Sequence, residues 1–384
     1  MGVETAPGTV DYTRIRARGG VKWSRDGGDV LAAWVADMDF DPPPAVTAAI
    51  RNFLDLGDLG YNSVGEQLAP AWAAFQERHH GWKPDPDLIR PFTTVLHALE
   101  TVLWYATEPG DGVVVFTPIY YPFLNAIEES GRRRISVELD REGWRIDPER
   151  LEAAIDPTTR VILFCQPHNP TGRVFDEDEI AAVADVAERH DLLVVSDEIW
   201  CDVTYDGPHR PLATADDRLA GRLITLGSAS KSFNLAGLRC AVSHLDYEPI
   251  RDVFATMPTH LLGGSSSLGV AGSIAAWTEC DDWLAATRDA LRIRRDQLVR
   301  RVEADLPGVR LDTPQATYLS WIDFSGTSLG DDPAIPIFEQ ARVALSEGPK
   351  FGANGAGFAR LNFATDERIL DDIIDRVAGL FGPA

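Results

Sequence analysis

The chain has 384 residues, of which 45% are hydrophobic and 25% are charged, and its formal net charge at pH 7 is −23. Such a length predicts one large domain with a smaller partner, or two comparable domains. A surface this acidic repels a phosphate backbone, so we expect no nucleic-acid partner. No apolar run approaches a membrane span and no signal peptide is visible, so we expect a cytoplasmic protein with no membrane contact.

The first 45 residues have little periodicity, and we expect them to form an N-terminal segment that packs on the smaller domain. From 46 to 275, short β-rich runs alternate with helical stretches such as 97–108 and 176–190. Strands are predicted at 113–117, 134–139, 161–165, 192–196, 223–227 and 238–245. Several of these runs are apolar throughout, as strands buried on both faces are. The pattern predicts a large α/β domain with a mainly parallel mixed sheet flanked by helices.

The pattern changes at about residue 276. A long helix over 281–304 is followed by a strand over 318–324, so residues 276–384 are predicted to form a smaller α+β domain. The four cysteines are far apart, without a C-x-x-C pair, and are expected to be buried core residues. No His, Cys and Asp residues have metal-ligand spacing, so no metal is expected.

Lys231 is the residue on which the functional argument depends. The chain has only four lysines, and this one follows the strand-like run 223–226 and a Ser-x-x-Lys step that begins at Ser228. A lysine amine can form a Schiff base with an aldehyde, and pyridoxal 5′-phosphate (PLP) is the common cofactor that uses one. That cofactor needs groups to hold its phosphate, a carboxylate for its pyridine nitrogen and an aromatic side chain against its ring.

Candidates for the phosphate lie around the lysine and at a helix start. Ser228 and Arg239 flank Lys231, and an arginine and a hydroxyl are groups that bind phosphate. The segment TTVLHALE (93–100) is typical of a strand end that leads into a helix. The backbone N–H groups of Val95 and Leu96 would then point toward an anion.

Candidates for the cofactor ring follow three predicted strands. Asp197 ends the run LLVVSD, Asn169 lies in the turn QPHNPTGR, and Tyr120 lies in FTPIYYPF. A carboxylate keeps the pyridine nitrogen protonated, an amide can bond the ring hydroxyl, and a tyrosine can stack on the ring. Each residue taken alone is also explained by a turn, a cap or a core position. Ligands bind at the carboxyl ends of parallel strands, and the agreement among these residues favours one site there.

These residues resemble the fold-type I PLP-dependent enzymes, the aspartate aminotransferase superfamily. The likeness extends from about residue 12 to the C-terminus and rests on NPTG (169–172), SDE (196–198), SASK (228–231) with Arg239, and FARLNFAT (358–365). It implies that Lys231 carries the cofactor, that Asp197 pairs with the pyridine nitrogen, and that Arg360 binds the substrate carboxylate. It also implies the roles given above for Asn169, Tyr120, Ser228 and Arg239.

A narrower resemblance is to the cystathionine β-lyase / cysteine C–S lyase branch. It rests on WVADMDF (34–40), which contains Ala36, on CQPHNPTGRVF (165–175), which contains His168, and on the closing FGANGAGFARLNFAT (351–365). The stretch YNSVG (61–65) resembles the segment whose tyrosine crosses the dimer interface. Ala36 and His168 are accordingly expected at the substrate. Tyr61 is expected to reach across a two-fold interface to the neighbouring active site, which implies a homodimer.

Trp200 departs from this pattern, because many relatives have Tyr or His three residues after the ring aspartate. An indole N–H donates a hydrogen bond but does not exchange a proton easily. Two interpretations stay open: altered tuning of the cofactor, or simple packing beside it. A second, smaller departure is Gln166, where the branch usually has Asn.

The resemblance implies a PLP-dependent C–S β-lyase that cleaves cystathionine or a related cysteine S-conjugate to a thiol, pyruvate and ammonia. Three alternatives remain open at this point. An aminotransferase of class I/II would share the same residues. A cysteine-conjugate-processing enzyme of small-molecule biosynthesis would belong to the same branch. A non-catalytic PLP-binding regulator is disfavoured by the acidic charge and the lack of an added DNA-binding domain.

Overall fold

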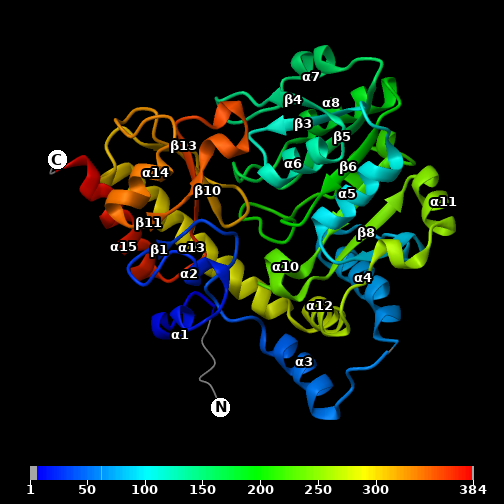
Figure 1. Cartoon of the computed structure of the whole chain (residues 1–384), viewed down its shortest axis with the longest axis horizontal. Helices are drawn as coiled ribbons and strands as arrows, with labels where there is room; N and C mark the ends of the chain where they lie inside the picture. Colours follow the sequence, from blue (N-terminus) through cyan, green and yellow to red (C-terminus); the bar gives the residue numbers. More distant parts are fainter. Residues whose placement is uncertain (1–6, 62, 383–384) are drawn as a thin grey trace. The chain divides into compact units, whose positions relative to one another are not determined.

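The computed structural model describes residues 7–61 and 63–382, except for the side chains of 259 and 260, and its chain path is drawn in Figure 1. The chain divides into two compact units. The first contains the chain up to Asp41, the short segment His168–Arg173, and the chain from Ala285 onward. The second contains Pro42–Pro167 and Val174–Leu284. The boundary near residue 285 therefore falls within a long helix.

A seven-stranded sheet forms the centre of the second unit, with strand order β2-β8-β7-β6-β5-β3-β4 (Figure 1). The strands are β2 (Ile89–Phe92), β3 (Gly112–Thr117), β4 (Arg133–Glu138), β5 (Thr159–Cys165), β6 (Leu193–Asp197), β7 (Leu223–Gly227) and β8 (Ala241–Asp246). Five neighbouring strands, β4, β3, β5, β6 and β7, pair in parallel. Strand β8 is antiparallel to both β7 and β2. This confirms the predicted α/β class with a mainly parallel mixed sheet.

Helices cover this sheet because its central strands are buried on both faces. Strand residues such as Val113, Leu163 and Val195 join one buried cluster with α5 (Val95–Ala106), α6 (Tyr121–Glu129) and α11 (Glu248–Thr256). Another cluster joins Ile89 and Val242 to α4 (Leu68–His80) and α12 (Ser267–Glu279). The second unit also contains α3 (Pro44–Leu56), α7 (Pro148–Ala154), α8 (Glu177–Arg189), α9 (Leu212–Ala215) and α10 (Ala229–Ser232).

Strand β8 begins three residues later than the sequence predicts. The expected strand covers 238–245, but Ala236–Leu238 form a short 3-10 turn and Arg239 has a left-handed backbone, with φ of 55°. A non-glycine residue rarely adopts that conformation, and it is incompatible with an extended strand. The sheet pairing therefore starts at Ala241, and Arg239 lies in the connection between the lysine turn and β8.

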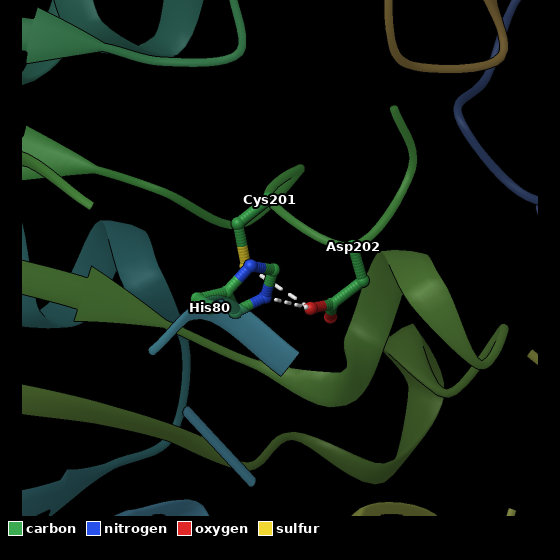
Figure 2. A group of neighbouring side chains, drawn as sticks. All are labelled: His80, Cys201 and Asp202. Carbon is green, nitrogen blue, oxygen red and sulfur yellow. Dashed lines mark hydrogen bonds and ion pairs between the residues drawn. The ribbon is translucent and has the colours of Figure 1, made fainter. Parts of the chain in front are cut away.

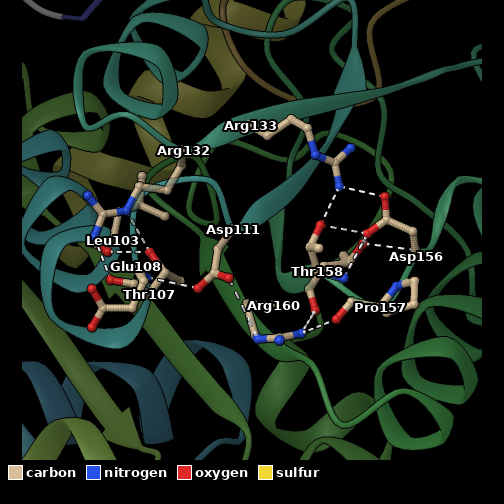
Figure 3. A network of polar contacts seen from close by, with 11 residues as sticks. Leu103, Thr107, Glu108, Asp111, Arg132, Arg133, Asp156, Pro157, Thr158 and Arg160 are labelled. Carbon is tan, nitrogen blue, oxygen red and sulfur yellow. Dashed lines mark hydrogen bonds and ion pairs between the residues drawn. The ribbon is translucent and has the colours of Figure 1, made fainter.

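Arg132 holds the carboxyl end of α5 (Figure 3). Its buried guanidinium donates to Thr107 Oγ1 at 2.8 Å and to the Trp104 carbonyl at 3.3 Å, and it also contacts the carbonyls of Thr107 and Ser130. The last carbonyls of a helix lack partners within the helix, and a cation there also complements the helix dipole. The end of α5 opposite to the predicted phosphate cradle is thus firmly anchored.

The first unit is a smaller α+β structure, and most of it comes from the C-terminal part of the chain. Its four-stranded antiparallel sheet has the order β12-β13-β10-β9. The elements are β9 (Arg310–Leu311), β10 (Leu319–Asp323), β12 (Ser346–Glu347) and β13 (Phe358–Asn362), with α14 (Ala334–Pro336) and α15 (Glu367–Ala378). The predicted strand at 318–324 corresponds to β10. The predicted helix at 281–304 corresponds to α13 (Asp281–Asp305), which continues into this unit.

The N-terminal segment belongs to this first unit. It contains α1 (Tyr12–Arg16), α2 (Val21–Ser24) and β1 (Leu31–Ala32), and β1 pairs in parallel with β11 (Val343–Ala344). Across the described part of the chain, no helix has the length and apolar character that crossing a bilayer requires.

Candidate active site

The lysine turn lies directly after β7 in the second unit. Ser228 is the N-cap of the short helix α10, and its hydroxyl accepts from Ser230 N at 3.1 Å while it donates to the Cys240 carbonyl at 2.6 Å. Lys231 lies in this helix, and its Nζ is 5.8 Å from the centre of the Trp200 ring. Trp200 is itself almost fully buried, in the turn that follows β6. The structure therefore brings Trp200 to the lysine.

Asp197 ends β6, the strand next to β7, and is buried. Burial raises the pKa of its carboxyl to about 7; the nearby charge of Glu198 adds to this rise, while the Ile199 N–H and the charge of Lys231 oppose it. The Ile199 N–H donates to Asp197 Oδ1 at 3.0 Å. A buried carboxyl that holds its proton so tightly has too little positive charge nearby, so it suits a cationic partner.

Three further predicted residues of the second unit, Val95, Leu96 and Tyr120, lie at the starts of helices. Val95 and Leu96 are the first two residues of α5, whose N-cap Thr94 accepts from the His97 N–H at 2.9 Å. The first N–H groups of a helix have no acceptor within it, so this end suits an anion. Tyr120 is half-buried just before α6, with its ring 5.8 Å from that of Phe123.

Arg360 is buried at the centre of β13 in the first unit. It donates to Asn169 Oδ1 at 3.0 Å, to the Trp34 carbonyl at 2.8 Å and to Ser346 Oγ at 3.1 Å. Its guanidinium carbon also lies 5.1 Å from the centre of the Phe351 ring. A buried guanidinium is a planar donor that can bind a carboxylate with two hydrogen bonds, so Arg360 suits a carboxylate ligand.

Asn169 is therefore a partner of Arg360, which the sequence did not suggest. Because the amide oxygen accepts from Arg360, the amide NH₂ group is the part of Asn169 that suits a ring hydroxyl. Ser346 and the Trp34 carbonyl were also missed, since a serine in β12 and a backbone oxygen carry no motif. Only strand pairing places Ser346 opposite Arg360.

The contacts of four other predicted site residues do not by themselves indicate a ligand. His168 is buried, and its Nδ1 lies 2.8 Å from Thr171 Oγ1 within the same turn. Ala36 is also buried, and its carbonyl accepts from the Tyr318 hydroxyl at 3.0 Å. Arg239 and Tyr61 are exposed. The structure thus connects Lys231 with Trp200, and Arg360 with Asn169, but it gives Arg239 and Tyr61 no comparable contact among the described residues.

The chain matches known proteins over almost its whole length. Residues 35–377 match the family described as aminotransferase class I and II. The chain is 33% identical to the cystathionine β-lyase PatB of Bacillus subtilis, over 93% of this chain and 95% of that protein. It is 31% identical to a cystathionine β-lyase of Corynebacterium glutamicum, over 96% of this chain and 99% of the relative.

A solved structure agrees with these sequence matches. It is a putative PLP-dependent β-cystathionase from Corynebacterium diphtheriae, with 33% identity, a TM-score of 0.92, and coverage of 97% of this chain and 98% of that one. A PLP-bound C–S lyase from Staphylococcus hominis is 26% identical, with a TM-score of 0.89 and coverage of 96% of this chain and 97% of that one.

Proposed function

Because the chain belongs to the aminotransferase class I and II family, in its carbon–sulfur lyase branch, we propose that it cleaves cystathionine or a related cysteine S-conjugate. The products are a thiol, pyruvate and ammonia. The enzyme uses pyridoxal 5′-phosphate, which when bound withdraws electron density from the substrate Cα. The observation that supports this most strongly is the buried Asp197 carboxyl at the end of β6, beside the strand that leads to Lys231.

Asp197, Asn169 and Tyr120 are proposed to hold the cofactor ring. A protonated pyridine nitrogen supplies the positive charge that the buried Asp197 lacks, and it would bring the pKa of this carboxyl down again. The Asn169 NH₂ group would donate to the ring hydroxyl, while Tyr120 would stack on the ring. Trp200, already beside Lys231, would pack against the cofactor at its edge.

The phosphate is proposed to lie between the start of α5 and the lysine turn. Val95 and Leu96 would donate backbone hydrogen bonds, and Ser228 and Arg239 would supply a hydroxyl and a guanidinium. Arg239 is exposed, and no ion pair holds its side chain among the described residues, so its guanidinium is able to turn toward an anion.

Arg360 is proposed to bind the substrate carboxylate, with Ala36 and His168 beside the substrate. Lys231, once the substrate amine has replaced it, removes the Cα proton as a general base. The electron pair of that C–H bond forms the Cα–Cβ double bond, and the Cβ–S bond breaks with release of the thiolate, which takes up a proton. Water then converts the released enamine to pyruvate and ammonia.

We propose that two copies of the chain form a homodimer in which Tyr61 reaches the neighbouring active site. Tyr61 is fully exposed, and three leucines that precede it in the sequence are exposed as well: Leu54, Leu56 and Leu59. Contiguous exposed apolar side chains of this kind are typical of a protein interface. A two-fold axis would bury the same segment of both subunits.

The direct test is release of pyruvate from L-cystathionine by the PLP-loaded protein, with no keto acid present. We expect pyruvate and homocysteine in equal amounts, together with ammonia. The Lys231→Ala variant should show no turnover and should still bind PLP, without a covalent link. Full activity in that variant would contradict the proposal for Lys231.

An aminotransferase remains the second candidate, since an aspartate aminotransferase of Bacillus subtilis is 27% identical over 91% of the chain. The same assay distinguishes the two. If pyruvate fails to form without a keto acid, while added keto acids become amino acids, the enzyme is an aminotransferase and the lyase proposal is wrong.

A further inference from the structure

Three residues of the second unit gather beside the lysine turn: His80, whose side chain is buried, and the buried Cys201 and Asp202 (Figure 2). His80 ends helix α4, and the other two lie in the turn after β6. His80 Nε2 lies 2.8 Å from Asp202 Oδ1, and the Cys201 thiol donates to the same oxygen at 3.3 Å. Ser232 Oγ donates to the other carboxylate oxygen, Oδ2, at 2.6 Å.

Although His, Cys and Asp are possible metal ligands, this group is better explained as a hydrogen-bonded network. Both oxygens of Asp202 already accept hydrogen bonds. Burial raises the pKa of the Cys201 thiol well above its usual value, and the charges of Asp202 and Glu198 raise it further. A thiol that keeps its proton is a hydrogen-bond donor, whereas a metal requires the thiolate.

Asp202 stays ionised in this network. Burial alone would raise the pKa of its carboxyl, but hydrogen bonds from His80, Ser232 and Cys201 and the charge of His80 outweigh burial and lower it. An ionised carboxylate only accepts, so His80 Nε2 carries the hydrogen that it shares with Asp202. His80 Nδ1 is buried and has no hydrogen-bond partner among the described residues.

Helix α4 fixes this network through other contacts as well. The Gln76 side chain hydrogen-bonds to Cys201. The Phe75 ring lies 6.1 Å from that of Phe233, the residue after Ser232. Helix α4 thus contacts both the turn after β6 and the lysine turn after β7.

These two turns carry Lys231 and Trp200. Ser232 directly follows Lys231, and Asp202 lies two residues after Trp200. The hydrogen bond between Ser232 and Asp202 therefore joins the residue after Lys231 to the turn that carries Trp200, whose ring centre lies 5.8 Å from Lys231 Nζ. We propose that His80, Asp202 and Ser232 form a clamp, anchored on α4, that positions Lys231 against Trp200. This inference rests on the proposed role of Lys231, and the clamp residues are positioning residues that act through it.

The test compares three variants of the PLP-loaded protein: Ser232→Ala, Asp202→Asn and His80→Gln. The first readout needs no substrate: the pH midpoint at which the visible absorbance of the bound cofactor changes. We expect Ser232→Ala and Asp202→Asn to shift this midpoint by roughly half a unit or more, because the lysine environment changes. His80→Gln keeps an N–H donor near the same place and should shift it least.

The second readout is turnover with the substrate on which the wild-type protein is active. In Ser232→Ala and Asp202→Asn, kcat should fall roughly 10- to 100-fold with little change in KM, since a displacement of about 1 Å costs a reacting group that much. The kinetic isotope effect with substrate deuterated at Cα should rise, because proton removal by Lys231 becomes slower.

His79→Gln is the matched control. His79 precedes His80 on the same helix and also pairs with an aspartate, with Nε2 2.9 Å from Asp281 Oδ1, but among the described residues no hydrogen bond joins Asp281 to the lysine turn. This variant should leave both readouts unchanged. If Ser232→Ala lowers only the melting temperature and matches wild type in absorbance midpoint, kcat and isotope effect, the network is merely structural and the proposal is wrong.

Ser232→Ala decides the matter even if Asp202→Asn does not fold, because it removes a single hydroxyl. Failure of the lyase assignment is recognised separately. In that case the wild type would lack β-elimination, while the absorbance midpoint would still report on the clamp.

Discussion

Asp197 and Asp202 are buried carboxyl groups five residues apart, and their pKa values are shifted in opposite directions. Burial raises the pKa of Asp197 to about 7, because its hydrogen bond from Ile199 N–H only partly offsets the loss of water. Burial acts on Asp202 as well, but hydrogen bonds from His80, Ser232 and Cys201 overcome it and lower the pKa. Partners, rather than depth, decide which carboxylate is ionised. Asp197 is the one left to pair with a ligand.

The raised pKa of Asp197 predicts how the stability of the cofactor-free protein depends on pH. The folded state binds this proton more tightly than the unfolded state, in which the group titrates near 3.8. The favourable contribution is therefore complete below about pH 4 and is lost as the pH rises toward 7. Asp197→Asn has no such loss, so its stability advantage over wild type should grow by on the order of 1 to 3 kcal/mol between pH 5 and 8.

Urea unfolding of both cofactor-free proteins at pH 5, 6, 7 and 8 measures this difference. All other titrating groups are shared by the two proteins and cancel in the comparison. An advantage that stays constant over this range would show that the pKa of Asp197 is not raised. With PLP bound, we expect the order to reverse, because the variant lacks the charge that pairs with the ring nitrogen.

At the scale of elements, the N-terminal segment of the first unit is braced internally by a buried ion pair. Lys22 Nζ lies 3.0 Å from Asp39 Oδ1, and both side chains are about as buried as core residues. Trp23 Nε1 donates to the same oxygen at 2.6 Å, and Lys22 also donates to the Asp37 carbonyl at 3.1 Å. The pair thus ties α2 to the segment that leads to Asp41.

Replacing one partner of this pair should be costly. Lys22→Met keeps most of the side-chain volume and leaves Asp39 as a buried charge without its cation. We expect the free energy of unfolding to fall by about 3 to 5 kcal/mol. Thermal and urea unfolding of the variant measure this loss.

Arg14→Gln is the matched control in the same segment. The Arg14–Asp41 pair is only 2.7 Å long, but the arginine side chain is 52% exposed, so its loss should cost less than about 1 kcal/mol. Equal losses for Lys22→Met and Arg14→Gln would mean that burial of the first pair contributes nothing.

At the scale of the whole molecule, the proposed dimer explains why Tyr61 is exposed in the single chain. The side chain is fully accessible, and the exposed Leu54, Leu56 and Leu59 come shortly before it along the chain. A tyrosine whose side chain is fully exposed on its own subunit is able to serve a site that a second copy brings to it.

This arrangement predicts a separation between assembly and cofactor affinity. Tyr61→Phe removes only the hydroxyl, so the protein should stay dimeric by sedimentation while its dissociation constant for PLP rises roughly tenfold, the loss of about one hydrogen bond to a charged group. Leu56→Glu, by contrast, places a charge in the apolar segment and should shift the protein toward monomers. A monomeric wild type would contradict the proposal.

Much of the fold and of the site was predictable from local patterns. Apolar runs of strand length showed where β3, β5, β6 and β7 lie, and the capping pair Asp176 and Glu179 marks the start of α8. Lys231, Asp197 and Asn169 were found because their chemistry sits in short motifs at strand ends. The family likeness confirms the fold, the cofactor and the lyase branch, whereas the role of each site residue stays a prediction.

Contacts between segments far apart in the chain had no such local signal. His80 and Asp202 lie 122 residues apart, and Ser346 faces Arg360 only through strand pairing. The segment His168–Arg173 groups with the first unit although its neighbours in sequence belong to the second. Local sequence specifies which backbone conformation and which chemistry a residue offers. Which distant groups meet it, and therefore its burial and pKa, follows from packing of the whole chain, as the contrast between Asp197 and Asp202 demonstrates.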